Sequence, residues 1–247
     1  MTDSYIAVDV ETTGLEVRQE KITELALVKV ERDSITDCFS TLINPGKPIG
    51  ETVSSLTGIT DEMVKDAPAI EEVIADALDF AGDLPLLGHN LLFDYRFIKK
   101  AAVNSGLEFE RQGVDTLNLC RIFMAAEQKK NLADACACYH IPQPQAHRAL
   151  ADAQSAHLLF QTMKKLHGGE RPQAFAPAPL FYRAKREQPA TKRQKEYLQD
   201  LIKYHRINVT VQMEHMSGNE ISRMTDKIIF TYGKIPRETR GKQSPDK

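Results

Sequence analysis

The spacing of hydrophobic and polar positions changes along this chain. In the first 45 residues the two kinds mostly alternate with a period of two, as on strands with one buried face, over residues 5–10, 21–33 and 34–45. The third run stops at Asn44-Pro45-Gly46, a turn sequence. The pattern predicts a three-stranded meander.

Apolar positions then recur at helical spacing, which predicts helices over residues 68–82, 92–106, 117–127 and 149–169. Short apolar runs at 84–90 and 113–116 predict two further strands. Strands followed by alternating helices and strands are typical of an α/β domain. We therefore expect a mixed five-stranded sheet flanked by helices over residues 1–167.

The composition changes after residue 167. Residues 168–190 are rich in Pro and Ala, which predicts a linker. Thr191 with Gln194, and Ser217 with Glu220, form two capping boxes, each at the start of an amphipathic pattern. The second pattern closes at Gly233. We expect a small helical module at 191–235 and a disordered tail at 236–247.

Composition and charge narrow the class of protein. The 247 residues are 42% hydrophobic and 27% charged, as in a soluble globular protein. No run approaches the roughly 18 apolar residues of a membrane helix, and the N-terminus lacks a signal-peptide pattern. We expect a cytoplasmic protein with no membrane partner. The net charge of −2 hides a split, because residues 168–247 carry +7 and residues 1–167 carry −9. The basic end either contacts an anionic partner or is simply a solvated surface.

Four cysteines, at 38, 120, 136 and 138, are too few for a disulfide framework at this length. Cys136, Cys138 and His140 could suggest a metal site, but the spacing differs from the C-x2-C pairs of zinc sites. Residues 131–141 have the pattern of an amphipathic helix. We expect reduced thiols packed in the core.

Two acids stand close together in the first predicted strand. Asp9 and Glu11 occupy positions i and i+2, so both project from the same face. Two carboxylates about 4 Å apart repel by roughly 4 kcal/mol at an effective dielectric of 20. The pair is explained either by a site that needs both acids or by an edge strand that turns them to solvent.

Two further stretches carry candidate residues. Asp94 lies in the first turn of a predicted helix, where an acid also complements the helix dipole. His147 comes just before the long helix at 149–169, and Asp152 lies in that helix's first or second turn. Taken singly, each residue has an ordinary structural explanation.

Together these stretches resemble one family. D-x-E-T-T-G at 9–14, H-N-x-x-F-D at 89–94 and H-x-x-x-x-D at 147–152 are similar, in order, to the three exonuclease motifs of the DEDD superfamily in its histidine-bearing branch. Residues 56–68 and 114–121 resemble the connecting segments of bacterial proofreading exonucleases of the DNA polymerase III type. The resemblance covers roughly residues 3–167 and implies a ribonuclease H-like fold.

The resemblance also implies a metal site. Asp9, Glu11, Asp94 and Asp152 would hold two Mg²⁺ or Mn²⁺ ions, which are hard cations that prefer oxygen ligands. Asp9 would bridge the ions, Glu11 and Asp152 would complete the nucleophile side, and Asp94 would support the second ion. His147 would be the general base toward the attacking water. Family positions expected to bind substrate are Thr12, Thr13, Gly14, Leu15, Asn90 and Phe93.

The expected function is a metal-dependent 3′–5′ exonuclease that releases nucleoside 5′-monophosphates from single-stranded or frayed DNA 3′ ends, in replication or repair. DNA is favoured over RNA, and a DNA polymerase is a candidate partner because the 247 residues hold no polymerase domain. Leu180-Phe181 in "PAPLF" also fits part of a sliding-clamp peptide. Two alternatives stay open, a 3′–5′ exoribonuclease and a non-catalytic nucleic-acid-binding or polymerase-docking protein.

Overall fold

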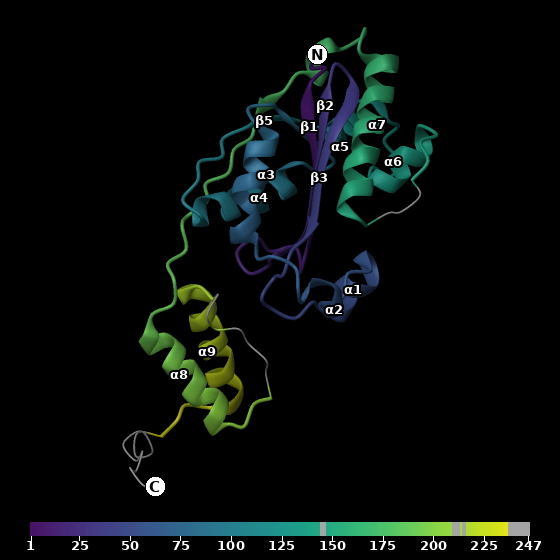
Figure 1. The fold of residues 1–247 in the computed structure, drawn as a ribbon. Coiled ribbons are helices and arrows are strands. Elements are labelled where there is room, and N and C mark those ends of the chain that lie inside the picture. The colour runs from purple at the N-terminus through teal and green to yellow at the C-terminus, as the bar shows by residue number, and fades with distance from the viewer. Residues whose placement is uncertain (144–146, 209–212, 214–215, 237–247) are drawn as a thin grey trace. The chain divides into compact units, whose positions relative to one another are not determined.

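The computed structural model describes residues 1–143, 147–208, 213 and 216–236 (Figure 1). The chain divides into two compact units, Met1–Arg186 and Glu187–Lys247. Within the described residues, no helix is long and apolar enough to span a membrane. The α/β fold predicted from the sequence is confirmed in the first unit.

The described residues of the first unit form a mixed sheet with the strand order β3-β2-β1-β4-β5-β6. Its strands are β1 (Tyr5–Thr12), β2 (Ile22–Glu31), β3 (Ser34–Leu42), β4 (Leu86–Gly88), β5 (Gln112–Asp115) and β6 (Ala178–Pro179). The first three strands are the predicted antiparallel meander, and β4 and β5 continue the sheet parallel to β1. The predicted count of five strands is wrong, because β6 adds an antiparallel edge strand beside β5.

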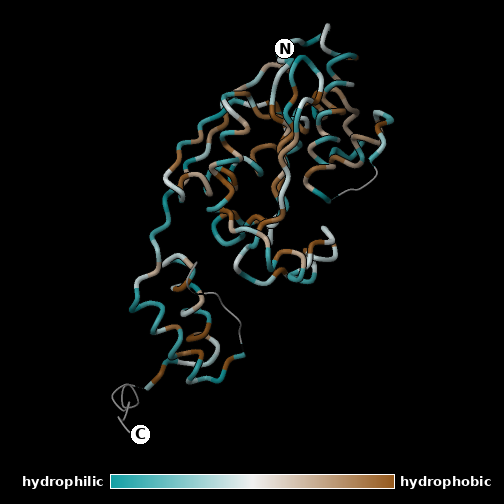
Figure 2. The backbone as a smooth tube through the Cα atoms, in the orientation of Figure 1, coloured by the Kyte–Doolittle hydropathy of each residue, from teal (hydrophilic) through white to brown (hydrophobic). Residues whose placement is uncertain are grey.

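Helices cover both faces of this sheet (Figure 1). The helices of the first unit are α1 (Glu51–Thr57), α2 (Asp61–Val64), α3 (Ile70–Ala81), α4 (Leu92–Asn104), α5 (Thr116–Phe123), α6 (Leu132–Cys138) and α7 (Ala149–His167). One core cluster joins β1 residues Ile6 and Val8 to α3 and α4. A second joins Tyr5 and Ala7 to α5, α6 and α7. The alternation of β1 thus supplies both cores, and Figure 2 shows hydrophobic residues along the central strands.

Most of the predicted linker at 168–190 is packed against the first unit. A 3₁₀ helix, Pro172–Phe175, places the fully buried ring of Phe175 between those of Phe123 and Phe160, at 5.6 and 5.9 Å between ring centroids. Proline is tolerated in β6 because an edge strand has one side without ladder hydrogen bonds. The division between the units falls after Arg186, inside the predicted linker.

The cysteine prediction is confirmed for the two cysteines on α6. Cys136 is buried and Cys138 is half-buried against the core of α5, α6 and α7, and neither forms a disulfide. Cys120 is buried as well, whereas Cys38 is exposed on β3. Burial raises the pKa of the Cys136 thiol to about 11, so this thiol stays protonated.

The second unit contains α8 (Lys192–Tyr204) and α9 (Gly218–Tyr232), and both predicted capping boxes are present. Gln194 near the start of α8 donates to the Gly218 carbonyl, and a ring nitrogen of His205, after the end of α8, lies 3.0 Å from the Gly233 carbonyl oxygen. The two helices therefore run in the same direction. Their contact buries a small core of Leu198, Leu201, Ile221 and Ile228. Apart from Pro236, the tail predicted at 236–247 lies outside the described residues.

Candidate active site

Two acids of β1 lie on the face of the sheet that α7 covers, and α7 carries a third acid, Asp152. Tyr5 and Ala7 face the core under α7, and by strand alternation Asp9 and Glu11 lie on the same face. The pairing of β4 with β1 reaches only Ala7, so the acids lie beyond the point where that pairing ends. β1 is a central strand of the sheet, so the alternative of an edge strand that turns the two acids to solvent does not apply.

Asp94 reaches the same end of β1 from α4. Its side chain is 3% exposed, and its Oδ1 accepts the backbone N–H of Val10 at 3.0 Å. Burial raises the pKa of Asp94 well above its usual range, even though the N–H donors favour its charged form. The carboxylate thus stabilises the strand at the point where β4 has already ended.

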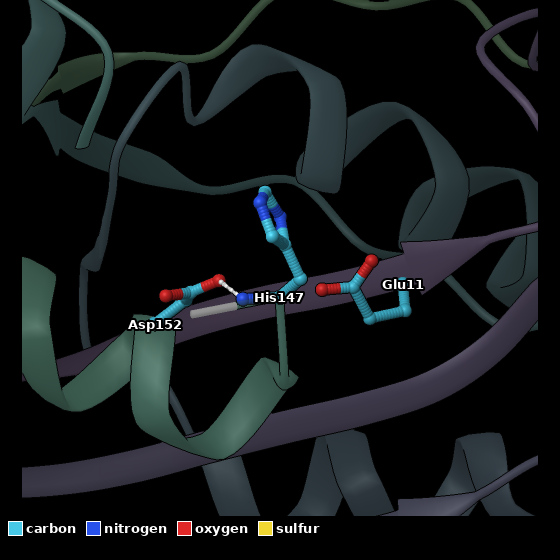
Figure 3. Close-up of side chains that lie close together, drawn as sticks. All are labelled: Glu11, His147 and Asp152. Atoms are coloured by element: carbon cyan, nitrogen blue, oxygen red, sulfur yellow. Dashed lines mark hydrogen bonds between the residues drawn. The ribbon is translucent and has the colours of Figure 1, made fainter. Parts of the chain in front are cut away.

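Glu11, His147 and Asp152 come together although the last two lie far along the chain. One potential ligand atom of each lies within 4.8 Å of the others. In Figure 3 His147 lies between Asp152 and Glu11. The backbone N–H of His147 donates to Asp152 Oδ2 at 2.9 Å, and Gln143 donates to Oδ1 at 2.7 Å. His147 has a φ of 62°, and this left-handed backbone conformation is uncommon for a non-glycine residue.

Burial, reinforced by like charges, dominates the electrostatics of this site. Burial, followed by the charges of Asp94, Glu11, Asp152 and Glu24, raises the pKa of Asp9 well above its usual range. Burial and the charges of Asp152 and Glu24 raise the pKa of Glu11 to about 7.

The donor set fits hard divalent cations. Burial raises the pKa of Asp152 as well, so in the protein alone burial disfavours the charged form of all four predicted acids. Bound cations would favour the charged form of these acids, because carboxylate oxygens are the ligands that Mg²⁺ and Mn²⁺ prefer. Asp9, Glu11, Asp94 and Asp152 can therefore hold the metal.

Glu24 is a fifth carboxylate, which the sequence analysis missed. It pairs with Glu11 across β1 and β2 and is 3% exposed. Its carboxylate accepts from Arg148 Nη2 at 2.8 Å, from Nε at 3.1 Å, and from the backbone N–H of Ala149 at 3.0 Å. This ion pair fixes the start of α7 beside β2. An acid among the apolar positions of residues 22–30 was the signal that could have identified it.

The predicted substrate-binding turn follows β1 directly. Thr12 Oγ1 donates to the Gly14 carbonyl at 2.7 Å, and Thr13 Oγ1 donates to the Glu20 carboxylate. A Cβ at Gly14 would lie only 2.9 Å from Glu20 Cγ, so glycine lets the turn pack closely. The turn presents Leu15 to solvent with 86% of its surface exposed.

The two predicted positions around α4 lie in different surroundings. Phe93 is half-buried, with its ring centroid 5.0 Å from that of Phe97. Asn90 is exposed, has a φ of 65°, and donates its backbone N–H to Asp115 at 2.9 Å. Asn90 lines a groove whose lining includes none of the four acids. A shared cleft for Asn90 and Phe93 stays a prediction.

Comparison with known proteins gives the class. A family model described as Exonuclease matches residues 6–160, well over half of the chain. The chain therefore belongs to this exonuclease family. The resemblance to DEDD-type 3′–5′ exonucleases with a ribonuclease H-like fold is confirmed.

Individual relatives are DNA polymerases of the PolC type. The chain is 39% identical over 166 residues to the PolC-type DNA polymerase III of Bacillus subtilis, and 39% identical over 168 residues to that of Staphylococcus aureus. Each alignment covers 66% of this chain but only 12% of the relative. The chain thus matches a small part of those polymerases.

Solved structures show the same fold. Exonuclease X in complex with 5′ overhanging duplex DNA is 28% identical, with a TM-score of 0.52, and the match covers 65% of this chain and 91% of Exonuclease X. E. coli Exonuclease I in complex with a dA16 oligonucleotide has a TM-score of 0.59 at 15% identity, over 70% of this chain and 42% of the other. At that identity, the second match shows the fold alone.

Proposed function

We propose that this chain hydrolyses the terminal phosphodiester bond at the 3′ end of single-stranded or frayed DNA and releases nucleoside 5′-monophosphates. The observation that carries the proposal is the approach of Glu11, His147 and Asp152 to within 4.8 Å. Asp9 and Asp94 lie close enough for their charges to interact. A protein that only bound nucleic acid would gain nothing from five such groups at one point.

Each side chain has a chemical role in this proposal. Two Mg²⁺ or Mn²⁺ ions held by Asp9, Glu11, Asp94 and Asp152 would supply Lewis-acid stabilisation of the charge that develops on the phosphodiester oxygens. The His147 imidazole accepts the proton of the attacking water, because histidine is the side chain that most often acts as a general base. The bond from its backbone N–H to Asp152 fixes His147 just before the start of α7. The turn that exposes Leu15 contacts the terminal nucleotide.

DNA is the proposed substrate rather than RNA. The relatives named above are DNA polymerases, and Exonuclease X was solved in complex with DNA. A partner polymerase would give the chain a proofreading role.

The activity is tested with the purified full chain, a 5′-labelled single-stranded DNA, and Mg²⁺ or Mn²⁺. We expect stepwise shortening from the 3′ end and release of mononucleotides, abolished by EDTA. Asp9→Asn should lower kcat at least about a thousandfold because it removes a charged ligand. Asp76→Asn, on the exposed surface of α3, is the matched control and should retain the wild-type rate.

His147→Ala should lower kcat by about 10² to 10⁴, the usual contribution of a general base. Full activity in His147→Ala would refute its role as the base. Equal activity in Asp9→Asn and the wild type would refute the proposal that this chain is a metal-dependent exonuclease. An RNA oligomer and a DNA primer with a mismatched 3′ end are run in parallel. Faster hydrolysis of RNA would replace the DNA proposal with the exoribonuclease alternative.

A further inference from the structure

A groove of about 460 Å³ lies at the β6 edge of the sheet in the first unit. Asn90, in the turn that leads into α4, lines it together with Asn118 and Arg121 of α5. Phe181, directly after β6, completes the lining and is 82% exposed. The volume is within the range of ordinary small-ligand sites, which begins at about 300 Å³.

The groove continues the row of sites at the carboxyl ends of the parallel strands. Asp9 and Glu11 lie toward the end of β1, Asp94 follows the end of β4, and Asp115 ends β5. Ligands of open α/β sheets bind outside these ends. Asp115 lines the groove, and its charge contributes to the raised pKa of Asp94, so the groove and the catalytic acids are neighbours.

The available chemistry of the groove matches a nucleotide. Asp115 already accepts the backbone N–H groups of Asn90 and Leu117, both at 2.9 Å. Arg121 is exposed and donates from Nη1 to Asn118 at 2.7 Å, which leaves further guanidinium donors for a phosphate. Phe181 offers a solvent-exposed aromatic face, on which a base of any identity can stack.

The edge that carries Phe181 lies outside the family match. Residues 174–181 lie beyond the family match, which ends at residue 160. Leu180 packs against the core, and its backbone N–H donates to the Arg111 carbonyl at 2.9 Å. The segment is therefore part of the sheet, which argues against "PAPLF" acting as a free sliding-clamp peptide.

We propose that this groove holds single-stranded DNA upstream of the scissile bond, with Phe181 stacking on a base and Arg121 contacting a phosphate. The inference rests on the proposed function and names a further part of the same substrate site. It assigns to Asn90 a contact with an upstream nucleotide rather than with the terminal one. An enzyme with this groove prefers oligonucleotides over substrates that have no nucleotide upstream of the scissile bond.

The test compares two substrates of the full chain with Mg²⁺. One is a single-stranded oligonucleotide of ten residues, and the other is thymidine 5′-phosphate esterified with p-nitrophenol, which has no upstream nucleotide. Phe181→Ala should raise KM for the oligonucleotide about tenfold, with kcat within twofold. Arg121→Gln should raise the same KM and lower the slope of log affinity against log salt by about one. Neither change should appear with the ester.

Two matched controls lie away from the groove. Leu166→Ala removes another exposed apolar side chain, 59% exposed at the end of α7. Arg32→Gln removes a cation at the turn between β2 and β3, toward the opposite edge of the sheet. Both should have wild-type KM for both substrates. An unchanged KM for the oligonucleotide in both Phe181→Ala and Arg121→Gln would overturn the proposal that the groove holds DNA. A wild-type chain inactive on both substrates would instead overturn the proposed function.

Discussion

At the scale of single residues, burial and neighbouring carboxylates disfavour the charged form of the acids in the site. Glu11 is partly buried beside Asp152 and opposite Glu24, and Arg148 offsets only part of this negative charge. The folded chain therefore holds a proton on Glu11 up to about pH 7, whereas a free glutamate loses it near 4.5. Ionised acids at this position lower the stability of the folded chain, and bound cations would offset that cost.

This difference in proton binding predicts a pH dependence. In EDTA, the contribution of Glu11 to stability is present below about pH 4.5 and is lost as the pH rises through about 7, because the folded state binds the extra proton. Glu11→Gln should flatten this fall, as measured by urea midpoints between pH 4.5 and 8. Saturating Mg²⁺ should raise the wild-type stability at pH 8 by about 2–3 kcal/mol at a hundred times the Kd. Parallel curves for the two proteins would contradict the prediction.

At the scale of elements, several contacts fix α7, which carries the predicted ligand Asp152, against the sheet. Glu24 pairs with Arg148 at its start. Further along, a His157 ring nitrogen lies 2.9 Å from the Tyr5 hydroxyl, and Lys164 pairs with Asp33. These contacts are spread along α7, and together they fix the position of Asp152 relative to β1.

Glu24→Ala should therefore lower both stability and activity. It leaves the Arg148 guanidinium and the Ala149 N–H without their buried acceptor, which we expect to cost about 2 kcal/mol. It should also lower kcat, because His147 and Asp152 lose their anchor. Chemical unfolding and single-turnover rates measure the two effects. Glu31→Ala, at the exposed end of the same strand, should change neither. Adding Arg148→Met to Glu24→Ala should recover part of the stability but not kcat.

At the scale of the whole molecule, the predicted active site and the basic helical module belong to different units. The predicted catalytic residues, the substrate-binding turn and the groove all lie in Met1–Arg186. The second unit has its own core and its own helix caps. Residues 187–247 carry 12 basic and 8 acidic side chains, an excess that suits a polyanion.

A chain that ends at Arg186 should retain kcat on short oligonucleotides, because no catalytic group is removed. Its affinity for longer single-stranded DNA should fall, with a shallower dependence on salt. Fluorescence anisotropy over a salt series tests this. Unchanged affinity and slope would favour the other interpretation of the basic end, a solvated surface that contacts no polyanion.

Much of the fold and site follows from local sequence. Alternation along residues 5–10 predicts both the strand and the shared face of Asp9 and Glu11, and each capping box lies within four residues. The order of the three motifs indicated the family before any contact was known. These features could be predicted because each depends on neighbours a few positions away.

Other features depended on distant surfaces. Pro and Ala at 168–190 predict a linker, but the pocket between Phe123 and Phe160 buries Phe175, and the open side of β5 accepts β6. Glu24 is, by local pattern, an acid on an apolar face, and only the approach of Arg148 explains it. The sequence by itself determined which residues could do the chemistry. Tertiary structure decided what holds them together, because burial and charge pairing join positions more than a hundred residues apart.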